Sequence, residues 1–357
     1  MTNVQFAEYL WIDGAQPTQQ IRSKARVVSV PANPAPSDFP EWSFDGSSTG
    51  QATGEDSDCI LAPVRAYADP LRSEGNYIVL CEVRDSDGAE HASNQRARLR
   101  GAIDRADASL APWAGFEQEY TLCRDGRPLG FPTDGYPAPQ GPYYCGAGAN
   151  LAFGRDVVEA HARACVQAGV LIYGINAEVM PGQWEFQVGH RGIEGEACDA
   201  LTIADGLWVA RYLLLRVSER FGVVVSFDNK PVKGDWNGAG MHTNFSTAAT
   251  RDPNRGMQAI HSIVASLEGR HHEHIGEYGD RLDERLTGAH ETCAIGTFAS
   301  GIANRGASIR IPQPVALKGY GYLEDRRPGA NADPYRVASC LVDAAANAGA
   351  EAAAHAA

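Results

Sequence analysis

Acidic side chains alternate with apolar ones in FEQEYTL (116–122), and this pattern limits the fold more than any other feature of the sequence. Successive side chains of a β-strand point to opposite faces of its sheet. Glu117 and Glu119 would therefore share one face, while the residues beside and between them pack on the other. In MHTNFS (241–246), His242 alternates with apolar residues in the same way. The 38 glycines and 20 prolines also favour turns and strands over a helical bundle. We therefore expect a sheet with one polar, largely acidic face.

Two further segments add carboxylates to this face. Pro181-Gly182 is a turn signal between two extended runs, so a hairpin would bring Glu178 and Glu185 together. Glu324 begins EDRRP beside two arginines. Each glutamate alone reads as part of a solvated strand face, but five glutamates and one histidine collected together repel one another unless cations bind. Oxygen ligands with one imidazole suit Mg²⁺ or Mn²⁺, and the sequence does not choose between them.

Arginines gather in the later, turn-rich segments 285–292, 303–312 and 324–328. The arginine fork donates paired hydrogen bonds to phosphate and carboxylate groups. The sequence has no G-x-x-x-x-G-K-[ST] motif, which argues against a P-loop. Metal ligands, arginines and no P-loop together predict phosphoryl transfer by positioning and charge neutralisation. The run HHEH at 271–274, by contrast, reads as a solvated surface stretch.

Length and charge limit the organisation and the partners. A chain of 357 residues is expected to form one large and one small domain. Its net charge of −13 argues against nucleic acids and anionic membranes as main partners. Eight cysteines without a C-x-x-C pair, no signal peptide at the N-terminus and no apolar run of about 20 residues predict a reduced, cytoplasmic protein. Helices are expected over 155–169 and 205–222, and one begins at a Ser/Asn cap near residue 94.

With these segments the chain resembles the type II glutamine synthetases. The sequences of its motifs look closest to those of the bacterial members. The resemblance is colinear from about residue 7 to residue 340. The motifs that carry it are DGSST (45–49), EQEYTL (117–122), PQGPYYCG (139–146), NAEVMPGQWEFQ (176–187), KGDWNGAGMHTNFS (233–246), LTGAHET (286–292), ANRGASIRIP (303–312) and GYLEDRRP (321–328).

The resemblance implies an α+β fold. It comprises a small N-terminal β-grasp domain (4–95), a larger catalytic domain with a curved antiparallel sheet and helices (96–343), and an alanine-rich tail (344–357). It also implies a homo-oligomer, a decamer of two pentameric rings with active sites between subunits. The activity implied is the ATP-dependent ligation of ammonia to L-glutamate through γ-glutamyl phosphate.

The resemblance also implies roles for individual residues. One Mg²⁺ or Mn²⁺ would be held by Glu119, Glu178 and Glu185, and the other by Glu117, His242 and Glu324. Glutamate and the γ-phosphate would meet Arg285, Arg305, Arg326, Asn237 and Gly238. The nucleotide would lie near Arg310, Asn244, Ser246 and Tyr322. Ammonium would bind at Asp45 and Ser48 of a neighbouring subunit with Tyr144, under a flap that carries Glu291.

Two segments depart from the family pattern. The loop at 190–205 is longer than usual, and the flap at 293–301 reads CAIGTFASG, where other members carry more polar residues. Three alternatives stay open: a γ-glutamyl ligase that uses another amine, a non-catalytic structural or regulatory homologue, and a guanidino-phosphotransferase. The last would use a reactive cysteine that has no place here, and a non-catalytic homologue would be expected to lose several metal ligands.

Overall fold

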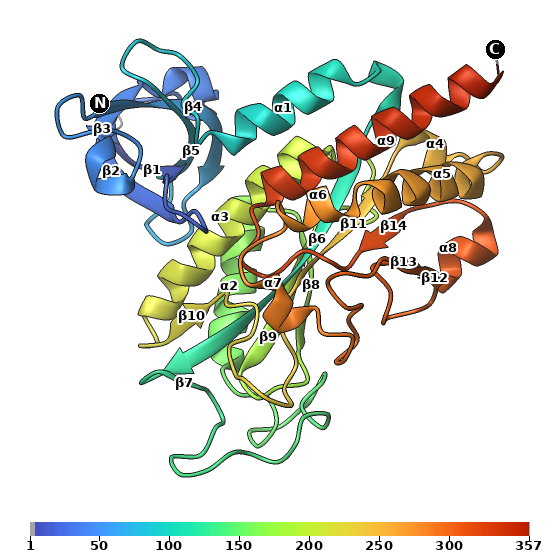
Figure 1. The fold of residues 1–357 in the computed structure, drawn as a ribbon. Coiled ribbons are helices and arrows are strands. Elements are labelled where there is room, and N and C mark those ends of the chain that lie inside the picture. The colour runs from blue at the N-terminus through green and yellow to red at the C-terminus, as the bar shows by residue number, and fades with distance from the viewer. Residues whose placement is uncertain (1–3, 357) are drawn as a thin grey trace.

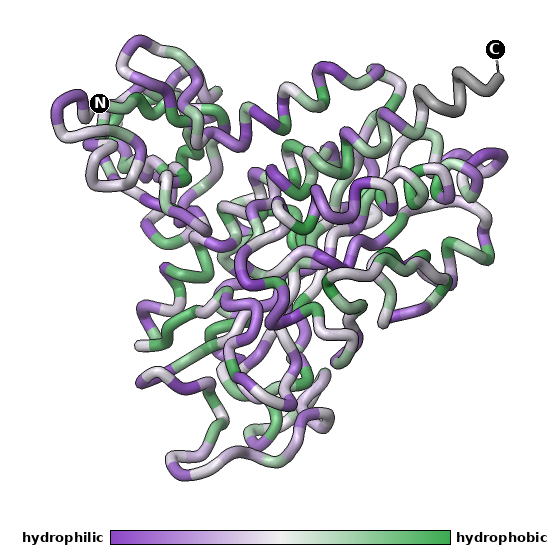
Figure 2. Tube along the Cα trace, in the orientation of Figure 1, coloured by the Kyte–Doolittle hydropathy of each residue, from purple (hydrophilic) through white to green (hydrophobic). Residues whose placement is uncertain are grey.

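Two separate β-sheets organise the chain (Figure 1). The computed structural model describes the backbone of residues 4–356 and the side chains of residues 4–349. The first sheet has the order β2-β1-β5-β4-β3, in which only the β1–β5 pair is parallel. Its strands are β1 (Gln5–Ile12), β2 (Ile21–Val28), β3 (Trp42–Asp45), β4 (Asp58–Ala68) and β5 (Tyr77–Arg84). In Figure 2 hydrophobic residues concentrate on these strands, which enclose a core of their own.

The second sheet has the order β12-β13-β14-β11-β6-β9-β8, and β7 and β10 also pair with β6. Neighbouring strands are antiparallel except for the parallel pair β12–β13. The strands are β6 (Trp113–Arg124), β7 (Arg127–Pro128), β8 (Ile172–Ala177), β9 (Gln183–Val188), β10 (Val224–Ser226), β11 (Met241–Ser246), β12 (Ser300–Ile302), β13 (Ile309–Ile311) and β14 (Leu323–Asp325). The long strand β6 lies between β11 and β9, so its outward side chains are central to one face.

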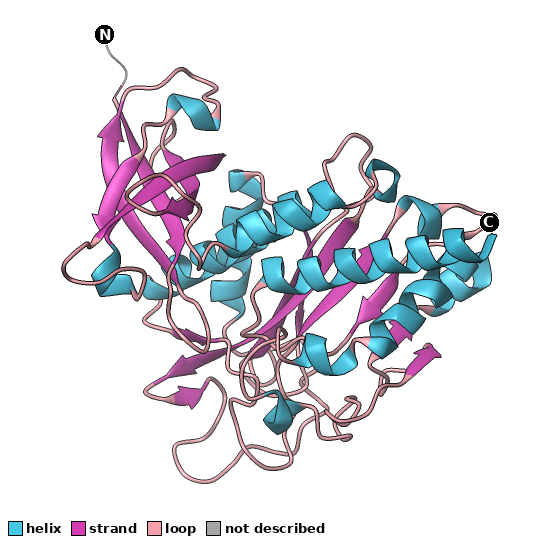
Figure 3. Ribbon diagram, turned by 45° about the horizontal axis from the view of Figure 1, so that its top comes forward, coloured by secondary structure: helices cyan, strands magenta, loops and turns pink. Residues whose placement is uncertain are grey.

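Helices cover the other face of this sheet (Figure 3). The buried helix α3 packs on β6, and α9 packs against α1, α3 and α5. The helices are α1 (Gln95–Arg105), α2 (Arg155–Ala168), α3 (Ala200–Glu219), α4 (Ala248–Arg251), α5 (Gly256–Gly269), α6 (His271–Ile275), α7 (Leu282–Arg285), α8 (Gln313–Lys318) and α9 (Pro334–Ala356), with 3₁₀ turns η1 (Pro36–Asp38), η2 (Gly46–Thr49) and η3 (Ala108–Leu110). The fold is thus a β-grasp sheet joined to a larger mixed domain, as expected.

Several element predictions are confirmed, with shifted ends. The Asn94 side chain caps α1 by accepting a hydrogen bond from the Ala97 amide. The helix expected over 205–222 begins at Ala200, because Asp199 caps it through the Thr202 amide. The last seven residues of the 190–205 loop, from Asp199 on, are therefore helix or cap. The alanine-rich segment from 344 continues α9 to Ala356, and Ala357 lies outside the described residues.

The prediction that 271–274 is a solvated run is wrong for two of its histidines. His271 is 5% exposed and His274 is 1% exposed. They pack on the guanidinium of Arg327, whose nitrogens lie 3.2 and 3.4 Å from their Nδ1 atoms. A four-residue polar pattern gives no sign of this partner, which is 53 or more residues away.

No helix in the described part of the chain is long and apolar enough to cross a membrane.

Candidate active site

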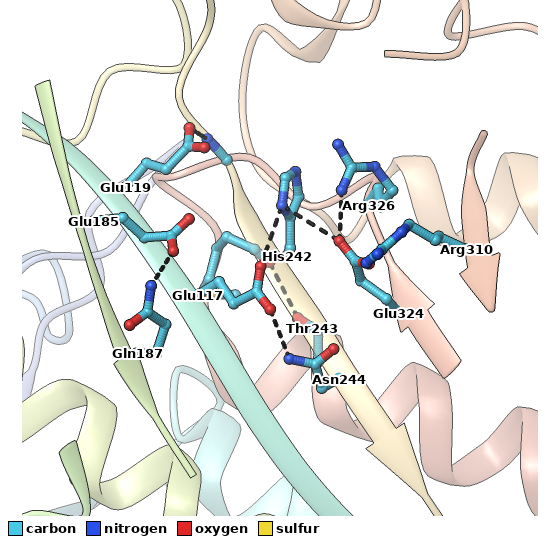
Figure 4. A network of polar contacts seen from close by, with 12 residues as sticks. Glu117, Glu119, Glu185, Gln187, His242, Thr243, Asn244, Arg310, Glu324 and Arg326 are labelled. Atoms are coloured by element: carbon cyan, nitrogen blue, oxygen red, sulfur yellow. Dashed lines mark hydrogen bonds and ion pairs between the residues drawn. The ribbon is translucent and has the colours of Figure 1, made fainter. Parts of the chain in front are cut away.

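The strand register places five of the six predicted metal ligands on one face of the large sheet (Figure 4). Glu117 of β6 pairs with His242 of β11, and Glu119 of β6 pairs with Glu185 of β9. Glu324 of β14 pairs with Asn244, two residues beyond His242. Directly opposed residues point to the same face, so four neighbouring strands deliver these side chains to one place. Sequence alternation predicted the face correctly, and the register supplies the order across the strands.

The opposite face of the same strands forms the core. Phe116, Tyr120, Trp184, Phe186 and Met241 are each at most 1% exposed. Burial of these large side chains holds the strands against α3 and fixes the register, because a one-residue slip would bury the carboxylates instead.

Two groups of side chains lie close enough to hold cations. Glu117, His242 and Glu324 offer ligand atoms within 4.8 Å of one another, and so do Glu119, Glu185 and His242. His242 Nδ1 is 3.6 Å from a Glu117 oxygen and 3.7 Å from a Glu324 oxygen. The first group is the predicted set. The second contains His242 where the resemblance implied Glu178, which lines the same cavity just past the end of β8.

The electrostatics of these carboxylates fit divalent cations. Burial raises the pKa of Glu119 to about 7, and burial together with Glu119 raises the pKa of Glu178 to about 8. Burial and the three neighbouring glutamates raise the pKa of Glu185 well above its usual range. Burial, with Arg326 and Arg285 nearby, lowers the pKa of His242, which keeps its imidazole neutral and able to bind a metal. Clustered carboxylates with one neutral imidazole are the donors expected for Mg²⁺ or Mn²⁺.

Polar groups next to the ligands orient them, and sequence reasoning missed these. The Gly240 amide donates to Glu119 Oε2 at 2.6 Å. Asn176 donates to Glu178 Oε1 at 2.9 Å, and Gln187 hydrogen-bonds both Glu185 and Asn176. Gln187 lies two residues after Glu185 on β9 and so shares its face, which the same alternation of side chains could have predicted.

Arginines close the opposite side of the cavity. Arg310 and Arg326 each donate to a separate oxygen of Glu324 at 2.5 Å. Arg285, 5% exposed, donates to the carbonyls of residues 326 and 327 and lies 3.0 Å from His242 Nε2. Arg326 also donates through Nε to the carbonyl of Arg305. The arginines therefore contact the Glu324 and His242 end of the ligand cluster directly and line the same cavity.

This cavity has a volume of about 720 Å³. Of the predicted site residues, the cavity is lined by Glu117, Glu119, Glu178, Glu185, His242, Glu324, Tyr144, Asn237, Gly238, Arg285, Glu291, Arg305, Arg310 and Arg326. Asn176, Gln187, Tyr173 and His290 also line it and were not predicted.

The remaining predicted residues lie outside the lining. Asn244 is adjacent, since its amide donates to Glu117 at 2.8 Å. Tyr322 is also near: burial raises the pKa of its hydroxyl most, and the charges of Glu117 and Glu324 raise that pKa further. Ser246 lies further along β11 and accepts from Arg251 at 2.9 Å. Asp45 and Ser48 belong to β3 and η2 of the small domain.

Residues 290–292 line one side of the cavity and contain an unusual turn. His290 and Glu291 both have left-handed backbones, with φ of 51° and 59°. Two successive non-glycine residues in this region are strained, which is typical of functional loops. The turn presents Glu291 to the cavity, while Arg326 Nη2 donates to its carbonyl at 3.4 Å.

A cavity that gathers two groups of potential metal ligands beside four arginines has the chemistry expected of a metal-dependent enzyme that acts on phosphate and carboxylate groups. Sequence comparison specifies the family. The family description "Glutamine synthetase, beta-Grasp domain" matches residues 3–86, and "Glutamine synthetase, catalytic domain" matches residues 93–262. The chain belongs to the glutamine synthetase family.

Individual relatives agree with this assignment. The chain is 52% identical over 346 residues to "Glutamine synthetase, chloroplastic" of Chlamydomonas reinhardtii, covering 94% of this chain and 89% of that protein. It is 52% identical to "Glutamine synthetase" of the fungus Hebeloma cylindrosporum and 53% identical to that of Streptomyces viridochromogenes, covering 94% of this chain and 92% and 95% of those proteins. These identities do not separate bacterial from fungal or algal relatives.

Proposed function

We propose that the chain ligates ammonia to L-glutamate with ATP, giving L-glutamine, ADP and phosphate through γ-glutamyl phosphate. The observation that carries the proposal is the meeting of the metal-binding carboxylates with Arg285, Arg305, Arg310 and Arg326 in one cavity. Family membership supplies the substrates.

The metal ions would bind on the sheet face. Glu117, His242 and Glu324 would hold one Mg²⁺ or Mn²⁺, and Glu119 and Glu185 with Glu178 the other. When bound, the ions neutralise charge on the ATP phosphates. The chain itself holds five carboxylates so close together that bound cations would be needed to offset their mutual repulsion.

The first chemical step joins two anions. An oxygen of the glutamate side-chain carboxylate attacks the γ-phosphorus, the bond to the β-phosphate oxygen breaks, and ADP leaves. Arg326 and Arg305 would hold the transferring phosphoryl group, because guanidinium groups offset the charge shared by both reactants. Arg285, Asn237 and Gly238 would orient the amino-acid substrate, and Arg310 the nucleotide phosphates.

The second step needs neutral ammonia. Ammonium would bind at Asp45, Ser48 and Tyr144 and lose a proton to Asp45 or Glu291, because only the free base is a nucleophile. Ammonia then attacks the acyl carbon and phosphate leaves. Serine hydrogen bonds, chiefly from Ser47 and then Ser48, lower the pKa of Asp45, which keeps it an anion that attracts ammonium. A closing flap would exclude water, which competes for the acyl phosphate.

Shared active sites follow from this assignment. Asp45 and Ser48 lie outside the cavity lining of their own chain, which supports a site completed by the small domain of a neighbouring subunit. We also propose that the chain is a type II enzyme most similar to the bacterial members, and that it forms a decamer of two pentameric rings in the cytoplasm. We place its domain boundaries at residues 95 and 343. Asn244, Ser246 and Tyr322 would flank the nucleotide.

The unusual flap does not favour another amine. Ile295 and Phe298 pack against the hydrophobic core, and none of the residues 293–299 lines the cavity. The polar residues that do line it, His290, Glu291 and Thr292, immediately precede the divergent stretch.

Phosphate release tests the proposal, using the full chain with ATP, Mg²⁺ and glutamate. We expect release with ammonium to exceed that with methylamine, ethylamine or no amine. Release only with an alkylamine would identify a different γ-glutamyl ligase, and no release with any amine would favour a non-catalytic homologue.

A further inference from the structure

The long loop between β7 and α2 brings a glutamine next to the cavity. Gln140 stands in this loop, and the residue after it, Gly141, lines the cavity. The Gly141 amide donates to the carbonyl of Val179 at 3.2 Å. Because Val179 directly follows Glu178, the backbone that carries Gln140 is attached to the segment that presents a proposed metal ligand.

The Gln140 side chain connects two further segments of the cavity lining. Its Oε1 accepts a hydrogen bond from the backbone amide of Asn237 at 2.7 Å. Its Nε2 lies 3.1 Å from Nδ1 of His290, the residue before Glu291. Asn237, His290 and Glu291 all line the cavity. One side chain therefore joins three segments that are distant in the sequence.

The hydrogen-bond donors and acceptors in this chain of contacts are complementary. A backbone amide can only donate, so the oxygen of Gln140 faces Asn237 and its NH₂ group faces His290. A neutral imidazole that accepts at Nδ1 bears its hydrogen on Nε2. That nitrogen lies 3.3 Å from a carboxylate oxygen of Asp235, which can accept it. Both ends of the Gln140 amide are thus used, and the His290 ring has one orientation that satisfies both of its nitrogens.

The turn at His290 and Glu291 needs contacts of this kind. Both residues have left-handed backbones, and strained turns persist only where the surrounding structure holds them. From outside the turn, Arg326 holds the Glu291 carbonyl, and Gln140 holds the His290 ring.

We propose that Gln140 is a positioning residue for the ligation. It holds Asn237 where the amino-acid substrate is oriented, and it holds the turn that directs Glu291 at the ammonium. The assignment rests on the proposed function, because the roles of Asn237 and Glu291 come from it.

Gln140→Met tests the role in steady-state kinetics of the full chain with ATP, Mg²⁺, glutamate and ammonium. Methionine keeps the length of the side chain and removes both hydrogen bonds. The KM values for glutamate and for ammonium should each rise by about 5-fold, while the KM for ATP stays unchanged. More phosphate should be released per glutamine formed, because a displaced turn lets water reach the acyl phosphate.

Hydrogen exchange measures the same contacts without catalysis. In the ligand-free protein, the Asn237 amide should exchange about 5-fold faster in Gln140→Met than in wild type. Gln258→Met is the matched control, since Gln258 is exposed on α5 and does not line the cavity. It should leave both the exchange of Asn237 and the kinetics unchanged.

His290→Asn should restore the contact in another form. The asparagine oxygen is attached to Cγ, as Nδ1 is in histidine, and asparagine tolerates the left-handed backbone of this position. This variant should keep the wild-type ratio of phosphate to glutamine. A ratio as high as that of Gln140→Met would show that the bond from Gln140 to residue 290 does not position the turn.

Two other results would overturn the proposal. Wild-type exchange of the Asn237 amide in Gln140→Met would contradict the hydrogen bond, and faster exchange with unchanged KM values and phosphate ratio would contradict the positioning role. Failure of the wild type to form glutamine would instead overturn the proposed function, and the exchange rates would still decide whether Gln140 holds Asn237.

Discussion

Replacing Glu178 by glutamine should stabilise the metal-free protein while weakening its metal binding. The Glu178 side chain is buried, and its pKa rises from 4.5 to about 8, first through burial and then through Glu119. Such a carboxyl favours folding below its unfolded pKa, and this contribution is lost as pH rises through the folded value. At about pH 7.5 the linkage relation gives a cost of about 4 kcal/mol.

The variant keeps most of the local hydrogen bonding. Asn176 can still donate to the glutamine oxygen, but the amide of Val179 loses its acceptor, at a cost of about 1 kcal/mol. The net gain is about 3 kcal/mol. For a chain of this length it corresponds to an increase of about 4 °C in the midpoint of thermal unfolding.

Thermal unfolding in EDTA at about pH 7.5 and at about pH 5 measures the effect. Near pH 5 the gain should fall below about 1 kcal/mol, because the carboxyl is then protonated in the fold, and protonating it costs little so close to its unfolded pKa of 4.5. Addition of Mg²⁺ should raise the midpoint of wild type more than that of Glu178→Gln.

Glu324→Gln is the matched control, and it should lower the free energy of unfolding where Glu178→Gln raises it. Glu324 is 1% exposed and accepts 2.5 Å hydrogen bonds from both Arg310 and Arg326. A glutamine would turn its NH₂ toward one of these donors, so we expect a loss of about 2–3 kcal/mol. If Glu178→Gln were less stable than wild type in EDTA at about pH 7.5, the account of Glu178 as a carboxyl destabilised by burial and by Glu119 would be wrong.

Three further predictions concern the proposed reaction and acid stability. Glu291→Ala should leave ATP binding intact by calorimetry and reduce glutamine formation by about 100-fold or more, as loss of a catalytic base does; an unchanged rate would contradict the flap assignment. Asp45→Ala should raise the ammonium KM with little change for glutamate, and mixing it with inactive Arg326→Ala under subunit exchange should restore activity if sites are shared; mixed oligomers without activity would exclude sharing between these residues. Burial lowers the pKa values of His161 and His274 to about 4, so each should cost about 2 kcal/mol of stability as pH falls from about 6.5 to 5; because Glu119 and Glu178 titrate with the opposite sign over this range, wild type is compared with His161→Phe, and an equal pH dependence of the two unfolding midpoints would show that His161 is not buried neutral.

The polar face of the large sheet was predictable because strand geometry is local. Alternation alone placed Glu117 with Glu119, and the Pro181-Gly182 turn joined Glu178 to Glu185. The sharing of His242 between two ligand groups was not predictable, since it depends on which strands become neighbours and in what register. The fold of the small domain came from resemblance, not from any pattern in its short strands.

The buried charge of Arg211, on the helix-covered face of the large sheet, was not predicted, and the reason is the same. Arg211 stands in LWVARYLLL, where a single arginine reads as the polar edge of an amphipathic helix. Its oxygen acceptors are Gln118 and two carbonyls after residue 329, all more than 90 residues away, and its Nη2 also contacts the sulfur of Met241. Helical periodicity says which face a residue shares, but not that a distant strand brings an acceptor to that face.

Strand β14 shows how charge on both faces can serve one site. Glu324 points to the cavity, while the next residue, Asp325, points to the core and is 0% exposed. Burial alone would raise the pKa of Asp325, but Arg327 at 2.6 Å and the Tyr278 hydroxyl at 2.9 Å hold it below its usual value.

The Arg327 guanidinium also contacts His271, whose Nε2 lies 2.8 Å from the carbonyl of Ile295 in the flap. Because this buried neutral imidazole bears a hydrogen on Nε2 when Nδ1 faces the guanidinium, it can donate to the flap. The base of the flap is therefore bound through two side chains to the strand that presents Glu324. This chain of contacts explains why a segment with few polar residues of its own can still be held at the edge of the cavity.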